Sequence, residues 1–155
     1  MGFGTLSLKG RALRLLSQRE HSRAELATKL ARHVQEGDDL NAVLDDLQAK
    51  DFINAHRVAE SLVHRRAARL GTQRLVQELR SKGLDDALVR ATAEQLRATE
   101  LERASAVWRQ RSGSVVADDA KERARQMRVL AARGFAGDVV RRVVRGGGSG
   151  EDDGL

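Results

Sequence analysis

The side chains best suited to chemistry in this 155-residue chain are cations, most of them arginines, that gather between residues 65 and 145. A guanidinium group can bond a carboxylate or a phosphate through two parallel hydrogen bonds. If nucleic acid is the partner, we expect contact to phosphates rather than to base edges. An alternative is that many of these cations are ordinary solvated helix residues. The predicted partner-binding residues are Arg65, Arg66, Arg69, Arg74, Lys82, Arg109, Arg111, Arg123, Arg128, Arg133, Arg141, Arg142 and Arg145.

The net charge of +6 is unevenly distributed along the chain. Residues 1–54 hold 8 basic and 8 acidic side chains, residues 55–104 hold 10 and 7, and residues 105–145 hold 10 and 4. The last ten residues, 146–155, are rich in glycine and carry three acidic side chains. A basic C-terminal side favours a polyanion or an acidic protein surface as the partner.

Metal chemistry has little support in the sequence. The chain has no cysteine, which excludes disulfides and thiolate zinc sites. His21, His33, His56 and His64 share no metal-ligand spacing, and we expect all four at the surface or at helix boundaries. We therefore expect no bound metal ion.

Acid–base or nucleophilic catalysis has equally little support. Among the paired carboxylates, Asp38-Asp39 and Asp85-Asp86 lie at predicted helix starts, where negative charge favours the positive end of the helix dipole. Ser149 lies in a glycine-rich stretch that follows no strand and opens no helix, so a phosphate loop is not expected. We expect no catalytic site and no cofactor.

The elements that must position the arginines are all predicted to be helices. Leu, Ala, Arg, Glu and Gln dominate, and proline is absent. Ser22 and Glu25 form a capping box, and Asn54, Thr72 and Asp119 are further predicted N-caps. Phe52 and Ile53 are expected to form an apolar plug, and Trp108 is expected in the core. Nine helices are predicted: residues 9–20, from Ser22 to about His33, a helix carrying Leu40 to Leu47, from Asn54 to about Leu70, from Thr72 to Gly83, from Asp85 through Leu96, from about Glu100 to the loop at Ser112, from Asp119 to Gly134, and a helix carrying Val139 to Val144.

These helices fall into three similar groups. Leu26 and Leu30 align with Leu75 and Leu79, and the Lys82-Gly83-Leu84 turn aligns with Arg133-Gly134-Phe135. A unit of about 45 residues buries little surface alone, so stacked units are expected to share their apolar faces. We predict an all-α, elongated and curved array of three tandem, helix-turn-helix-like three-helix repeats. Its parts are an N-terminal lead at 1–8, repeats at 9–54, 55–99 and 100–145, and a disordered tail at 146–155.

The second and third repeats carry an ordered series of motifs. In the central repeat these are Asp51-Phe52-Ile53-Asn54, Val58-Ala59, Arg65, Gly71, Arg74-Leu75, Glu78-Leu79 and Lys82-Gly83-Leu84. In the third repeat they are Leu130, Arg133-Gly134-Phe135 and Val139-Val140. With these motifs the chain resembles, over residues 9–145, the RecX family, the modulators of the RecA recombinase. Asn54 stands where the family usually has an acidic residue, although asparagine also caps a helix.

The resemblance implies a non-enzymatic, monomeric, cytoplasmic protein that acts in DNA repair, homologous recombination and the SOS response. RecX proteins bind along the groove of the RecA–DNA filament and damp ATP hydrolysis and strand exchange, with weak non-specific DNA contact as a further possibility. No apolar run approaches the roughly 20 residues that span a bilayer, so no membrane partner is expected. The alternative function is direct DNA binding by a helix-turn-helix regulator or architectural protein.

Overall fold

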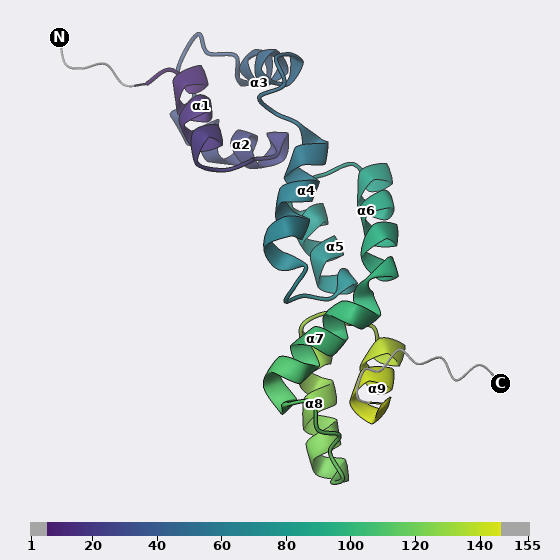
Figure 1. Cartoon of the computed structure of the whole chain (residues 1–155). Helices are drawn as coiled ribbons and strands as arrows, with labels where there is room; N and C mark the ends of the chain where they lie inside the picture. The colour runs from purple at the N-terminus through teal and green to yellow at the C-terminus, as the bar shows by residue number, and fades with distance from the viewer. Residues whose placement is uncertain (1–5, 147–155) are drawn as a thin grey trace.

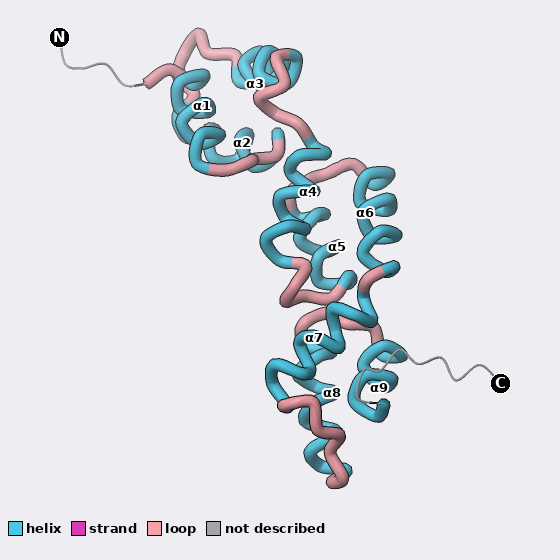
Figure 2. The backbone as a smooth tube through the Cα atoms, in the orientation of Figure 1, coloured by secondary structure: helices cyan, strands magenta, loops and turns pink. Residues whose placement is uncertain are grey.

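The computed structural model describes residues 6–146, and every regular element within that range is helical (Figure 2). The predicted tail, except Gly146, and most of the predicted N-terminal lead lie outside the described residues. The elements are α1 Leu8–Gln18, α2 Arg23–Leu30, the 3-10 helix η1 Ala31–His33, α3 Leu40–Ala49, α4 Ala55–Arg66, α5 Thr72–Ser81, α6 Asp86–Ala98, α7 Glu100–Ser112, α8 Ala120–Ala132 and α9 Gly137–Gly146.

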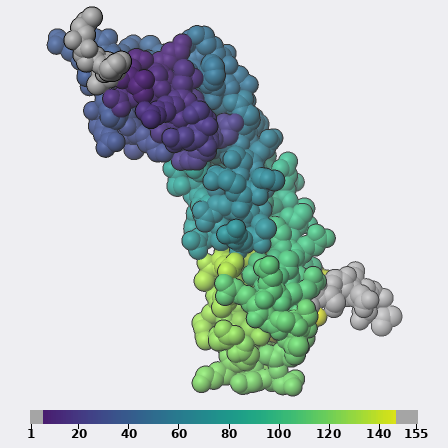
Figure 3. Space-filling model, turned by 60° about the vertical axis from the view of Figure 1, so that its left-hand side comes forward, coloured from purple at the N-terminus to yellow at the C-terminus, as the bar shows by residue number. Residues whose placement is uncertain are grey.

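The helices form three units stacked end to end, with α1–α3 in unit 1, α4–α6 in unit 2 and α7–α9 in unit 3 (Figure 1). The array is elongated and bends where unit 1 meets unit 2 (Figures 1 and 3). The predicted all-α repeat array is therefore confirmed. Between units 2 and 3 only Thr99 separates α6 from α7.

Most of the predicted helix starts are confirmed. The Ser22 hydroxyl accepts from the Glu25 backbone N–H at 3.1 Å, and the Glu25 carboxylate accepts from the Ser22 backbone N–H at 3.1 Å. Asn54 caps α4, and Asp119 caps α8. The predicted Thr72 cap is wrong, because Gly71 holds the N-cap position and Thr72 is the first residue of α5.

Each unit has its own hydrophobic core, so the prediction that stacked units share their apolar faces is wrong. Leu26 and Leu44 belong to the core of unit 1, Leu62 and Leu79 to that of unit 2. Trp108 is buried in the core of unit 3, as predicted, and its indole N–H donates to the Gln126 side chain at 3.0 Å. The contacts between units are instead largely polar.

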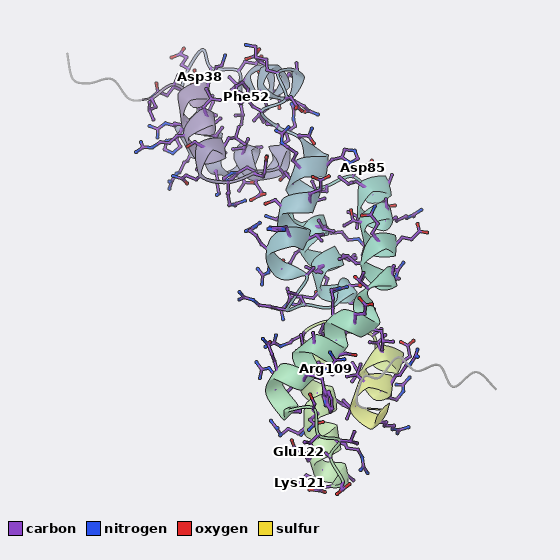
Figure 4. All side chains as sticks on the ribbon, viewed as in Figure 1. Asp38, Phe52, Asp85, Arg109, Lys121 and Glu122 are labelled. Carbon is purple, nitrogen blue, oxygen red and sulfur yellow. The ribbon has the colours of Figure 1, made fainter. Side chains whose placement is uncertain are left out.

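Phe52 departs from the sequence expectations, and His21 meets them in a buried position. Phe52, labelled in Figure 4, is 47% exposed, whereas its neighbour Ile53 is buried. Both residues lie in the bend after α3, where their backbone N–H groups donate to the Leu47 carbonyl, and only Ile53 is turned into the core. His21 lies at a helix boundary, as predicted, and is buried there. It bonds the Arg19 carbonyl and the Lys29 ammonium, and burial lowers its pKa, so a neutral imidazole fits this position.

Side chains hold the first junction, between units 1 and 2. The Ser22 hydroxyl, at the start of α2, donates to the Lys82 carbonyl at 2.6 Å. The Lys82 ammonium forms an ion pair with Glu25 at 3.2 Å. A second ion pair joins Glu20 to Arg57 at 2.9 Å. Unit 1 is therefore fixed to the α5–α6 turn and to α4 largely through hydroxyl and charged groups.

Candidate functional site: an arginine groove

The second junction, between units 2 and 3, is built from backbone groups. The Gly71 N–H donates to the Arg133 carbonyl at 2.8 Å, and the Gln73 N–H donates to the Gly134 carbonyl at 3.2 Å. A Cβ atom on Gly71 would lie 2.2 Å from the carbonyl carbon of Gly134, so no larger residue fits. Gly134 itself has φ +91°, a left-handed conformation that favours glycine. The two glycines bring the α8–α9 turn directly against the start of α5.

A half-buried arginine of α7 joins the same two units. Arg103 donates to the carbonyl groups of Ala67, Leu70 and Leu96 and to the Thr72 hydroxyl. These acceptors end α4 and α6 and begin α5, where helix-terminal backbone groups lack partners within their own helices. Burial lowers the pKa of the Arg103 guanidinium. Arg103 was not predicted as a functional residue, because no local pattern shows that these distant carbonyls converge on it.

Five predicted partner-binding arginines gather beside this junction and line a groove of about 600 Å³ together with Leu70. We call it the arginine groove. Two of the five also bridge the units, because Arg74 donates to the Ala132 carbonyl and Arg133 donates to the Arg69 carbonyl, each at 3.2 Å. In Figure 3 the yellow-green surface of unit 3 meets the blue-teal surface of unit 2 at this level. The five arginines are Arg65, Arg66, Arg69, Arg74 and Arg133.

The positive charge of the groove is poorly compensated. Among the described residues, only Arg66 of the five has an ion pair with a carboxylate, at 3.3 Å to Glu78. Burial lowers the pKa of Arg133, and repulsion from Arg111 and Arg69 lowers it further. An anion placed in the groove would relieve this repulsion. The arrangement is therefore suited to binding phosphate or carboxylate groups.

The other predicted cations do not join the groove lining. Lys82 lies at the first junction, where it is paired with Glu25. Arg123 donates to the Ala117 and Asp118 carbonyls and so holds the loop before α8. The remaining six are exposed on α7, α8 and α9, where Figure 4 labels Arg109. These six are Arg109, Arg111, Arg128, Arg141, Arg142 and Arg145.

Histidine, aspartate and glutamate side chains are the remaining candidates for metal or acid–base chemistry. No group of three or more His, Asp or Glu side chains in residues 6–146 could hold a metal ion. Asp39 caps α3, while Asp38 accepts from the Gln35 backbone N–H. None of the described helices is long and apolar enough to cross a membrane.

Comparisons with known proteins agree with the three-unit architecture. The profiles of the first, second and third three-helix domains of RecX match residues 9–47, 56–92 and 98–144. The chain is 55% identical over 140 residues to the regulatory protein RecX of Leptothrix cholodnii, covering 90% of this chain and 88% of that protein. It is 50% identical over 149 residues to the regulatory protein RecX of Ralstonia nicotianae, covering 96% and 93%.

A solved structure shares the fold. The crystal structure of RecX from Lactobacillus salivarius superposes with a TM-score of 0.74 at 20% identity, covering 88% of this chain and 92% of that chain. At this identity the likeness concerns the fold alone.

Proposed function

The chain belongs to the RecX family, and we propose that it acts on the RecA recombinase by binding along the RecA–DNA filament and damping ATP hydrolysis and strand exchange. The family relatives are named regulatory proteins, in keeping with a role in binding rather than catalysis. As a monomer, the elongated array would lie along the filament groove, in the cytoplasm.

The arginine groove is the observation that best supports binding to the filament. Its five arginines come from two units, so a ligand there would touch both units at once. Four of the five have no carboxylate partner among the described residues. Acidic side chains of the recombinase, or phosphates of the DNA within the filament, would supply the missing negative charge.

Direct DNA binding by the free protein is the alternative function. It is supported by the same unpaired arginines and by the helix-turn-helix-like units. Binding to phosphates alone would be weak and would fall steeply with added salt. Sequence-specific duplex binding that persists at high salt would favour this alternative over filament regulation.

The test is the rate of RecA ATP hydrolysis on single-stranded DNA with increasing amounts of the chain. We expect inhibition by the wild type and about tenfold weaker inhibition by Arg65→Glu combined with Arg69→Glu, since the two reversals replace attraction by repulsion. Arg128→Glu combined with Arg142→Glu makes the same charge change outside the groove. Unchanged hydrolysis at equimolar wild-type chain would reject the proposed function. Equal inhibition by the groove variant would move the contact to another face.

A further inference from the structure

A second groove lies in unit 1, between α1 and the α2–η1 segment, and has a volume of about 690 Å³. We call it the N-terminal groove. Arg11 and Arg14 line it from α1, one helical turn apart, and Lys29 and Arg32 line it from the opposite side. His33 and the apolar side chains of Leu6, Leu15 and Leu30 complete much of the wall. No acidic residue contributes to the lining.

The cations of unit 1 are sorted into two classes. Unit 1 carries equal numbers of basic and acidic side chains, so its net charge gives no hint of a basic surface. Four of its cations form ion pairs with carboxylates of the same unit: Lys9, Arg19, Arg23 and Lys50. The other four have no carboxylate partner within residues 6–146, and all four line the N-terminal groove.

Two of these cations, Arg11 and Arg32, act on His33 in the groove, while Lys29 contacts His21. Arg32 donates to Nε2 of His33 at 3.2 Å, which requires this nitrogen to be unprotonated. Desolvation lowers the pKa of His33, and the charges of Arg11 and Arg32 lower it further. Arg11 comes from α1 and Arg32 from η1, so both walls contribute to one positive region.

Apolar surface accompanies the charge. Leu6 is 45% exposed, one of few large hydrophobic side chains in the described part of the chain that remain open to solvent. Leu15 is half-buried and lies in the same lining. A ligand that fills this groove would therefore meet aliphatic side chains beside the cations. No phenylalanine, tyrosine or tryptophan among the described residues lines the groove.

We propose that the N-terminal groove binds an acidic protein segment in which carboxylates flank an aliphatic side chain. Arg11, Arg14 and Arg32 bond the carboxylates, and Lys29 adds a fourth positive charge. The aliphatic side chain packs against Leu6 and Leu15 and removes their surface from water. The volume of the groove is in the range that holds a ligand of a few side chains.

The lining favours a peptide over a nucleic acid strand. The thymine methyl is the one aliphatic group that a base offers, and it is smaller than the leucine side chain that it would have to cover. Single-stranded bases are usually held by stacking on several aromatic side chains, and this groove has no phenylalanine, tyrosine or tryptophan among its described lining residues. The site is also separate from the arginine groove, because unit 2 lies between α1–α2 and α7–α9 (Figure 1). The proposal therefore stands without the proposed action on RecA.

The experiment measures fluorescence anisotropy of a short labelled peptide of glutamate, leucine and serine added to the full chain. We expect saturable binding that weakens about tenfold in Arg14→Glu combined with Arg32→Glu, because both side chains are exposed and lose attraction. Arg128→Glu combined with Arg142→Glu should bind like the wild type. Circular dichroism checks that each variant is folded, and the milder pair Arg14→Gln and Arg32→Gln provides a second measurement with an intermediate loss.

Two control ligands separate the possible occupants. The same peptide with glutamine for glutamate tests the carboxylates, and a peptide with serine for leucine tests the aliphatic contact; both should bind more weakly. Equal binding of the acidic peptide by the wild type and by both groove variants would overturn the proposal. Binding of oligothymidylate that depends on Arg14 and Arg32, without binding of the peptide, would overturn it in favour of a phosphate backbone.

Discussion

The two junctions of the array use corresponding elements but different chemistry. In both, the start of a unit's second helix meets the glycine turn of the following unit: α2 meets the turn at Gly83, and α5 meets the turn at Gly134. Ser22 and Gly71 hold the equivalent N-cap positions. At the first junction the Ser22 side chain makes the contact to a turn carbonyl, whereas at the second the Gly71 backbone makes it.

The comparison shows that the same arrangement of helices can form a rigid junction through backbone contacts or a more adaptable junction through side chains. The backbone contact at Gly71 and Gly134 leaves no room for adjustment. A Cβ atom at either position would overlap the backbone of the facing segment. A contact through a hydroxyl group and two ion pairs depends on side-chain rotamers and charge state. We expect the second junction to hold its two units in a more fixed relative orientation than the first junction does.

The largest effect is expected at the glycine contact. Gly71→Ala should destabilise the chain by about 3 kcal/mol, because the new methyl group collides with the Gly134 backbone. Urea unfolding followed by Trp108 fluorescence reports unit 3, and far-UV circular dichroism reports all helices. In the variant the two transitions should separate. Gly137→Ala is the control, since its Cβ would meet only the flexible end of Arg141 at 3.2 Å. Coincident, unshifted transitions in Gly71→Ala would show that the junction is compliant after all.

A smaller loss is expected from the arginine fork of the second junction. Arg103→Lys should lower the free energy of unfolding by about 2 kcal/mol. One ammonium group cannot reach the carbonyl groups at the ends of two different helices, so some of these carbonyls would lose their hydrogen bonds. The measurement is the same urea unfolding. Arg109→Lys, at an exposed position of α7, should leave stability within about 0.5 kcal/mol of wild type. A lysine variant as stable as the wild type would mean that water satisfies these carbonyls.

The smallest effect is expected at the first junction and should depend on pH. Burial alone would raise the pKa of Glu25, but hydrogen bonds from Arg19, Ser22 and Lys82 outweigh it and lower the pKa from 4.5 to about 2. The ionised carboxylate therefore stabilises the fold above about pH 4.5, and this contribution is lost as the pH falls towards 2.

Glu25→Gln should cost about 1 kcal/mol at pH 7, after allowance for solvent screening at the partly exposed Arg19, and less at pH 3. Thermal unfolding of both proteins across this range measures the difference. Glu36→Gln, on an exposed residue, is the matched control. A stability difference between wild type and Glu25→Gln that is the same at pH 3 and pH 7 would contradict the assignment.

Local patterns predicted most of the fold. The leucine spacing and the Ser22–Glu25 capping box indicated the helices of unit 1, and the glycine turns indicated the repeat. Contacts between units were beyond such patterns: nothing near Gly71 in the sequence shows that it touches Gly134. The expectation of shared apolar faces failed because each unit closes its own core and leaves polar groups for the junctions.

The candidate sites were predictable only in part. The arginine-rich composition singled out all five arginines that line the arginine groove, but it also singled out eight other cations. It could not separate the two sets, because only folding brings Arg133 beside Arg69. The N-terminal groove was missed, because the balanced charge of unit 1 concealed the sorting of its cations. A signal was present: Arg11 and Arg14, like Lys29 and Arg32, are three residues apart, which places each pair on one helical face.

Only one residue, Thr99, connects α6 to α7, so the orientation of unit 3 relative to unit 2 depends on the length of this connection. Thr99 has non-helical backbone angles (φ −112°, ψ 5°) that set the direction of α7 relative to α6, so one inserted residue there would reorient everything after it. Arg133 would then swing away from Arg69, and the arginine groove would be divided between two faces. Natural variation in the length of this connection is thus expected to be far more restricted than in the α7–α8 loop, where an added residue moves no unit relative to another.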